Sequence, residues 1–73
     1  MKIWILRRLI PDEHGGLHIQ FKAVYRTPEG AMRYVDEVFE KNAGRWQDVG
    51  YGYVKKSSVV RGYWEVSYSY MND

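Results

Sequence analysis

A single helical pattern stands between segments that alternate apolar and polar residues as β-strands do. Thr27, Pro28 and Glu29 supply an N-cap, a residue suited to the first helical position and an acid that complements the helix dipole. Asn42 and Gly44 favour a left-handed helix end. We therefore predict one amphipathic helix over residues 28–43. Its apolar face has the i, i+3, i+4 spacing of a core-facing stripe: Ala31, Tyr34, Val35, Val38 and Phe39.

Two strand-like runs precede this helix. Residues 2–10, KIWILRRLI, are apolar on both faces, and residues 17–26, LHIQFKAVYR, alternate with one apolar face that begins at Leu17 and ends at Tyr25. PDEHGG lies between them, and its paired glycines suit a turn. The sequence thus predicts a β-hairpin followed directly by the helix.

Two further strands are expected after the helix, at residues 50–55 and 59–70, with residues 45–50 as a connector. The predicted fold is α+β: an antiparallel four-stranded sheet with one helix packed on one face, in the order ββαββ. The expected core also includes one of the two faces of the first strand. Its other members are Ile19, Phe21, Tyr25, Ala31, Val35, Val38, Phe39 and Val66.

Length and composition limit the class of protein. Seventy-three residues suffice for a single domain, and the absence of cysteine excludes disulfides, thiolate metal sites and cysteine nucleophiles. The early apolar run at residues 3–6 is too short for a signal peptide or a membrane span. We expect a cytoplasmic protein that does not interact with membranes.

No constellation of residues predicts catalysis or metal binding. His14 and His18 are separated by the Gly-Gly turn and lack a third ligand. Asp36, Glu37 and Glu40 lie close in sequence, but the helical pattern puts them on the solvent face, where carboxylates keep ordinary pKa values. We expect no enzyme, no cofactor and no metal.

The segment VGYGYVKK, residues 49–56, resembles the RNP1 strand of the RNA recognition motif, in which aromatic residues stack on bases. Tyr51 and Tyr53 would be the stacking rings. The predicted topology argues against that fold, because PDEHGG leads into a strand where the motif requires a helix. The alternative is that glycine relieves crowding in an edge strand.

Charge and aromatic residues point to binding. The net charge is +3 over residues 1–27, −2 over residues 28–48 and +1 over residues 49–73, so the sheet is basic and the helix acidic. Seven of the twelve aromatic residues lie after residue 45. Tyrosine, tryptophan and arginine are enriched in binding hot spots. The candidate binding residues, for a protein or a nucleic acid, are Lys22, Arg26, Tyr51, Tyr53, Arg61 and Tyr63.

The first strand also suggests self-association. One helix covers one face of a sheet, yet this strand is apolar on both faces, so a loop or another chain is needed to cover the second. We expect a homodimer or a tight complex with another protein. Trp4 and Tyr63 are the expected interface rings if the helix takes the face of Ile3 and Ile5.

The stretch AVYRTPEGAMRYVDEVFEKN, together with the closing Trp64-Glu65-Val66 strand, resembles segments in small uncharacterised proteins of bacteriophages and bacteria. The resemblance covers roughly residues 20–42 and 63–70. It implies a ββαββ layout and a binding role toward a host or phage macromolecule, in the host cytoplasm, with no site residue carried over. The function expected is a non-enzymatic protein-binding module that regulates or inhibits a host protein. The alternative is single-stranded nucleic-acid binding through a basic, aromatic sheet face.

Overall fold

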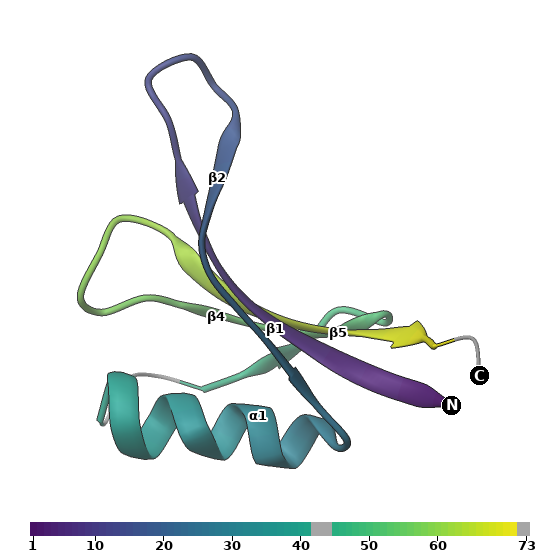
Figure 1. Cartoon of the computed structure of the whole chain (residues 1–73). Coiled ribbons are helices and arrows are strands. Elements are labelled where there is room, and N and C mark those ends of the chain that lie inside the picture. The colour runs from purple at the N-terminus through teal and green to yellow at the C-terminus, as the bar shows by residue number, and fades with distance from the viewer. Residues whose placement is uncertain (42–44, 72–73) are drawn as a thin grey trace.

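The computed structural model describes residues 1–41 and 45–71 and shows an α+β fold (Figure 1). One helix of twelve residues lies against a five-stranded antiparallel sheet, in the chain order ββαβββ. The strands are β1 (Lys2–Pro11), β2 (Leu17–Tyr25), β3 (Gln47–Asp48), β4 (Gly52–Lys56) and β5 (Tyr63–Tyr70). They are arranged in the order β2-β1-β5-β4-β3, which puts β5 at the centre.

The predicted class and element order are confirmed, with one strand more than expected. The expected connector at residues 45–50 contains β3, which pairs Gln47 with Val54 and Asp48 with Tyr53. The last strand begins at Tyr63 and not at residue 59, because the chain turns between β4 and β5, where Ser57 N–H bonds to the Gly62 carbonyl.

The helix begins where the sequence predicts. α1 (Pro28–Tyr34) has Thr27 as N-cap, and the Thr27 hydroxyl accepts a hydrogen bond from Gly30 N–H at 3.1 Å. α1 continues into one π-helical turn, η1 (Val35–Phe39), closed by the bond from Glu40 N–H to the Val35 carbonyl. The helix therefore ends earlier than expected, and the proposed end at Asn42 and Gly44 lies outside the described residues.

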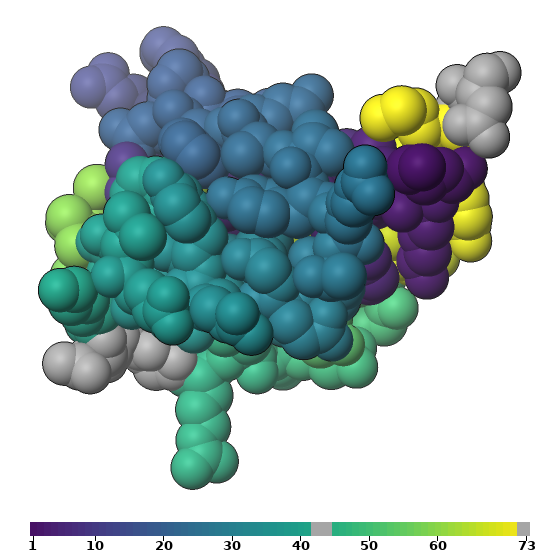
Figure 2. Space-filling view, turned by 60° about the horizontal axis from the view of Figure 1, so that its bottom comes forward, coloured from purple at the N-terminus to yellow at the C-terminus, as the bar shows by residue number. Residues whose placement is uncertain are grey.

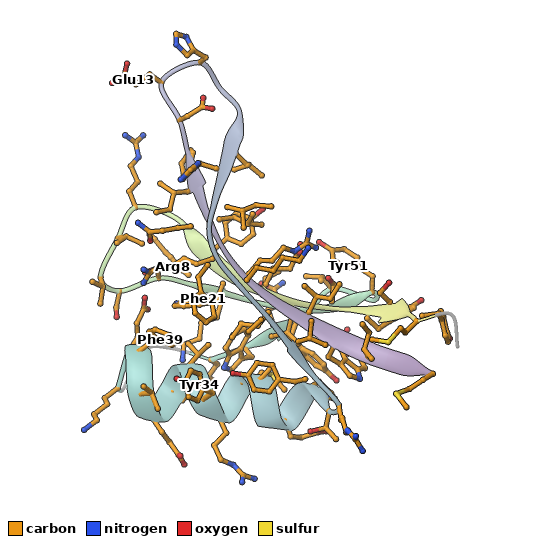
Figure 3. The ribbon with its side chains drawn as sticks, viewed as in Figure 1. Arg8, Glu13, Phe21, Tyr34, Phe39 and Tyr51 are labelled. Carbon is orange, nitrogen blue, oxygen red and sulfur yellow. The ribbon has the colours of Figure 1, made fainter. Side chains whose placement is uncertain are left out.

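The helix covers the face of β1 that carries Trp4 and Leu6. The fully buried centre combines three sheet residues with two helix residues: Leu6, Trp64, Val66, Ala31 and Val35. Phe21, Tyr25 and Phe39 pack against this centre, as do Trp4, Met32 and Trp46. Figure 3 shows Phe21 and Phe39 between the helix and the sheet, and Figure 2 shows the helix packed beside β2. Tyr34, which the spacing put on the core-facing stripe of the helix, is 39% exposed.

Two expected core residues are exposed. Ile19 is 48% exposed because a β-bulge between Arg8 and Leu9 shifts the register, pairing Phe21 with Arg8 but Ile19 with Leu9. Val38 is 56% exposed. In the wider π turn each residue rotates the chain less, so Val38 does not return to the face of Val35.

Candidate functional site

We call the face of the sheet opposite the helix the open face. It carries Ile3, Ile5, Arg7 and Leu9 of β1, because Leu6 and its cross-strand partner Val66 lie on the helix side. One row of paired residues crosses the whole sheet on this face. In strand order the row is Lys22, Arg7, Glu65, Val54 and Gln47.

A polar cluster lies in the middle of this row. The Arg7 guanidinium forms an ion pair with Glu65 and donates a hydrogen bond to Ser67 Oγ at 3.0 Å. Tyr51 Oη donates to the second Glu65 oxygen at 3.4 Å. Glu65 is only 8% exposed even though no helix covers it. The charge of Glu65 is therefore matched within the cluster and is not offered to a ligand.

Glu65 also changes the acidity of the neighbouring Tyr51. The negative charge of Glu65 raises the pKa of the exposed Tyr51 phenol, and burial and the hydrogen bond to Glu65 act in the same direction. The Tyr51 phenol therefore keeps its proton to higher pH than an isolated tyrosine does, and it donates a hydrogen bond to Glu65. Figure 3 shows its ring on the side of the sheet away from the helix.

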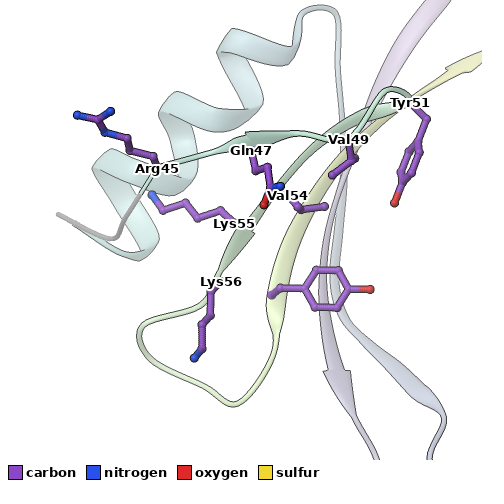
Figure 4. A pocket seen from close by; sticks show the side chains of 8 residues that line it. Arg45, Gln47, Val49, Tyr51, Val54, Lys55 and Lys56 are labelled. Atoms are coloured by element: carbon purple, nitrogen blue, oxygen red, sulfur yellow. The ribbon is translucent and has the colours of Figure 1, made fainter.

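A groove of about 560 Å³ lies beside this cluster, along β3 and β4 (Figure 4). We call it the basic groove. Val54 and Lys56 of β4 belong to the open face, and Lys55 between them reaches the groove only in part. The lining residues are Arg45, Gln47, Val49, Tyr51, Val54, Lys55, Lys56 and Tyr63.

The basic groove has two chemically different ends. Val49, Val54 and the Tyr51 ring make one end apolar and aromatic. Arg45 and Lys56 stand toward the other end, and both are exposed. No carboxylate lines the groove among the described residues.

Lys55 lines this groove without adding a free charge to it. It is 3% exposed, and its ammonium is directed to the helix side, where it pairs with Asp36 and lies 5.4 Å from the Trp46 ring centre. Asp36 also accepts hydrogen bonds from the Trp46 indole N–H at 3.2 Å. This group joins the helix to β4. The Asp36 side chain is 42% exposed, in line with the predicted solvent face, but its carboxylate is paired with Lys55 and Trp46.

Glu40 was also predicted to lie on the solvent face of the helix, and the structure contradicts this. It is 2% exposed and accepts hydrogen bonds from Ser57 Oγ at 2.6 Å and from Ser58 N–H at 2.8 Å. One guanidinium nitrogen of Arg8, Nη1, lies 3.9 Å from Glu40 Oε2. The closing bond of the π turn brings Glu40 back over Val35, toward the sheet. Glu37 is exposed and the Asp36 side chain is 42% exposed, so of the three carboxylates only Glu40 is withdrawn from solvent.

Burial by itself would raise the pKa of Glu40, but the hydrogen bonds from Ser57 and Ser58 outweigh it and leave this pKa below its ordinary value. The Trp64 indole also lowers it, although its N–H makes no well-formed hydrogen bond in the described part of the chain. Glu40 is therefore an ionised structural anchor and not an acid or base poised for proton transfer.

The structure separates the predicted binding residues. Tyr51 and Tyr63 share the basic groove, whereas Tyr53 is on the helix side, its ring centroid 6.3 Å from that of Trp4. Tyr51 and Tyr53 therefore lie on different faces of the sheet and do not form the stacking surface of an RNP1 strand, in agreement with the topological argument against that motif. Gly52, between them, relieves crowding in the sheet as the alternative interpretation expected, because a Cβ there would lie 2.0 Å from the Val66 carbonyl oxygen.

The predicted cations do not form one site either. Lys22 is on the open face of the edge strand β2. Arg26 follows Tyr25, which pairs with Trp4, whereas Arg61 precedes Gly62, which abuts the Leu9 backbone. Arg26 and Arg61 thus lie toward opposite ends of β1. Arg45 and Lys56 were not among the predicted binding residues. They line the same groove because the short strand β3, which the sequence did not predict, pairs with β4.

The proposed pair of dimer rings is also divided. Trp4 lies on the helix side, where its ring is 5.8 Å from that of Tyr68, and Tyr63 lies on the open face. They cannot belong to one flat interface. The pair was expected only if the helix covered the face of Ile3 and Ile5, and the helix covers the other face.

His14 and His18 are exposed, and no group of three potential metal-ligating side chains occurs among residues 1–41 and 45–71. No helix in the described part of the chain is long and apolar enough to cross a membrane. No known protein family, curated protein or solved structure matches this chain.

Proposed function

We propose that this chain is a non-enzymatic binding module that recognises another protein through the open face of its sheet. The observation that carries the proposal is the basic groove. The Tyr51 and Tyr63 rings, two valines, and the exposed Arg45 and Lys56, which form no ion pair with any described residue, line one depression there. Tyrosine and arginine are favoured anchors in protein interfaces, and grooves with an apolar floor and a polar rim are typical of peptide recognition.

The ionisable groups within the fold support binding over catalysis. Glu40 and Glu65 are engaged by hydrogen bonds from Ser57 and Tyr51, and Asp36 is engaged by Lys55. Each such carboxylate has a structural partner that would have to be displaced before it could accept a proton from a substrate. The free groups that remain on the open face are suited to contact and not to proton transfer.

The resemblance to small bacteriophage proteins suggests a host protein as the partner, which would make the chain a regulator or inhibitor in the host cytoplasm. The partner could also be a second copy of this chain. In such a homodimer through the open face, Tyr63 would lie in the interface and Trp4 would not. Sedimentation equilibrium of the purified chain distinguishes a self-partner from a different one, since only the first changes the mass of the chain alone.

Nucleic-acid binding is the second candidate, and the observation in its favour is that two aromatic rings and two cations share one groove. The dispersal of Lys22, Arg26 and Arg61 weighs against it, because a single strand needs a continuous basic track. An oligonucleotide mobility shift at two salt concentrations tests it. Binding to single strands should weaken with a log–log slope of about −0.7 for each phosphate neutralised.

The main proposal is tested by differential capture. The immobilised chain is compared with Tyr63→Ala, which removes a ring from the groove, and with Tyr70→Ala, which removes an exposed ring from the other face. We expect a specific protein to be retained by the parent and Tyr70→Ala and lost with Tyr63→Ala. Equal retention by all three proteins would contradict recognition through the open face.

A further inference from the structure

The basic groove restricts the chemistry of the partner, and this inference rests on the function proposed above. We infer that the groove binds an acidic segment of another protein in which an apolar side chain lies close to carboxylates. The apolar side chain would occupy the end formed by Val49, Val54 and Tyr51, and the carboxylates would contact Arg45 and Lys56.

The first support is charge. Arg45 and Lys56 line the same groove, and no carboxylate among the described lining residues balances them. Lys55, the third basic residue of the lining, is already neutralised by Asp36 on the helix side. Both side chains are exposed at the rim of the groove, so an anionic segment that crosses it can contact each of them without displacing an ion pair among the described residues.

The second support is that the carboxylate nearest the basic groove, Glu65, is already neutralised by its neighbours. Glu65 is the carboxylate of the row that crosses the open face, and its oxygens are held by Arg7 and Tyr51. An approaching acidic segment therefore meets the Tyr51 ring and the two free cations, not an exposed negative charge. The acidic helix residues Glu29 and Glu37 lie on the opposite side of the molecule from the open face.

The third support is the apolar end, which distinguishes a peptide from a nucleic acid. Val49 and Val54 offer aliphatic surface that suits a leucine or isoleucine side chain. Base stacking would instead need rings exposed in succession, and Tyr53 is turned to the helix side. The arrangement therefore favours an acidic protein segment over a single strand.

The test measures fluorescence anisotropy of a short dye-labelled peptide that joins a leucine pair to a run of glutamates. The control peptides replace the glutamates with lysines or the leucines with serines. The parent chain is compared with Arg45→Glu and Lys56→Glu and with Arg33→Glu, which makes the same charge change on the exposed outer side of the helix. Thermal melting of each variant confirms that it folds.

We expect the parent to bind the acidic peptide and both control peptides to bind at least about tenfold more weakly. Arg45→Glu and Lys56→Glu should each weaken binding by about fivefold to tenfold, and Arg33→Glu by less than about twofold. No binding of the acidic peptide, equal losses with all three variants, or tighter binding of a labelled oligothymidine would each overturn the inference.

The failure of this inference is distinguishable from failure of the proposed function. If Tyr63→Ala abolishes capture of a protein that Arg45→Glu and Lys56→Glu still retain, the open face binds a protein but not through acidic groups. If none of the three changes alters capture, both the function and the partner chemistry are wrong.

Discussion

Glu40 accepts a hydrogen bond from the Ser57 hydroxyl at 2.6 Å, and this contact joins the end of the helix to the turn between β4 and β5. The Ser58 backbone N–H completes the attachment at 2.8 Å. The carboxylate is thereby satisfied despite its burial. A segment that makes no regular secondary structure is thus held by one ionised side chain.

This attachment predicts a dependence of stability on pH. Because the pKa of Glu40 is below the ordinary value of 4.5, the folded state binds its proton more weakly than the unfolded state does. Its contribution is therefore present above that ordinary value and is lost as the pH falls through the folded-state pKa. Glu40→Gln should lower the free energy of unfolding at pH 7 by about 1–3 kcal/mol.

Urea unfolding of the parent and of Glu40→Gln at neutral and acidic pH measures this effect. The difference between the two proteins should shrink as the pH is lowered. Glu37→Gln is the matched control, since Glu37 is exposed on the same turn and should change stability by less than about 0.5 kcal/mol. An unchanged difference at acidic pH would show that Glu40 acts by packing and not by charge.

Phe39 and Val38 provide a second matched pair. Phe39 packs on Trp64 and Phe21 with ring centroids 5.2 and 4.9 Å away, whereas Val38 is largely exposed. Phe39→Ala should cost about 3–5 kcal/mol, and Val38→Ala less than about 0.5 kcal/mol. Chemical denaturation of both variants tests the assignment, and similar losses would contradict the π turn that separates them.

Gly52 predicts a backbone effect at the β4–β5 pairing. A Cβ at this position would approach the Val66 carbonyl oxygen to 2.0 Å, and neither backbone can yield without breaking the ladder. Gly52→Ala should destabilise the fold by about 3 kcal/mol or more. Gly50→Ala is the control, because nothing lies within 4 Å of a Cβ at Gly50, so only the strain of its φ of +93° opposes the change, at about 1–2 kcal/mol. Thermal melts of the two variants provide the comparison.

The sequence predicts those parts of the fold that local chemistry determines. Thr27 caps the helix as expected because the cap, the proline and the acid act within one turn. The hairpin turn is equally local, with Asp12 accepting hydrogen bonds from the His14 and Gly16 backbone N–H groups at 2.8 Å. These features need no knowledge of distant residues.

The structure differs from the sequence prediction where a bulge or a π turn, formed in the folded protein, changes the regular alternation of buried and exposed side chains. The bulge puts Ile19 and Phe21 on opposite faces although they are two residues apart, and the π turn exposes Val38 while it buries Glu40. A two-residue strand such as β3 carries too few residues to show a period, yet it brings Arg45 and Lys56 to one groove. Tyr51 and Tyr63, the two rings of the basic groove, were both among the predicted binding residues, whereas Arg45 and Lys56 were not.

Tyr51 provides a final prediction, which tests the polar cluster of the open face directly. The charge of Glu65 raises the pKa of the Tyr51 phenol, and Arg7 opposes this only in part. Glu65→Gln removes the negative charge, so the Tyr51 titration midpoint should move down. Carbon NMR of the labelled tyrosine ring carbons follows each phenol separately. Glu13→Gln, at the tip of the β1–β2 hairpin (Figure 3), removes one negative charge far from Tyr51 and should leave that midpoint unchanged. Equal shifts in both variants would indicate a general effect of net charge, and the contact between Tyr51 and Glu65 would then not account for the raised pKa.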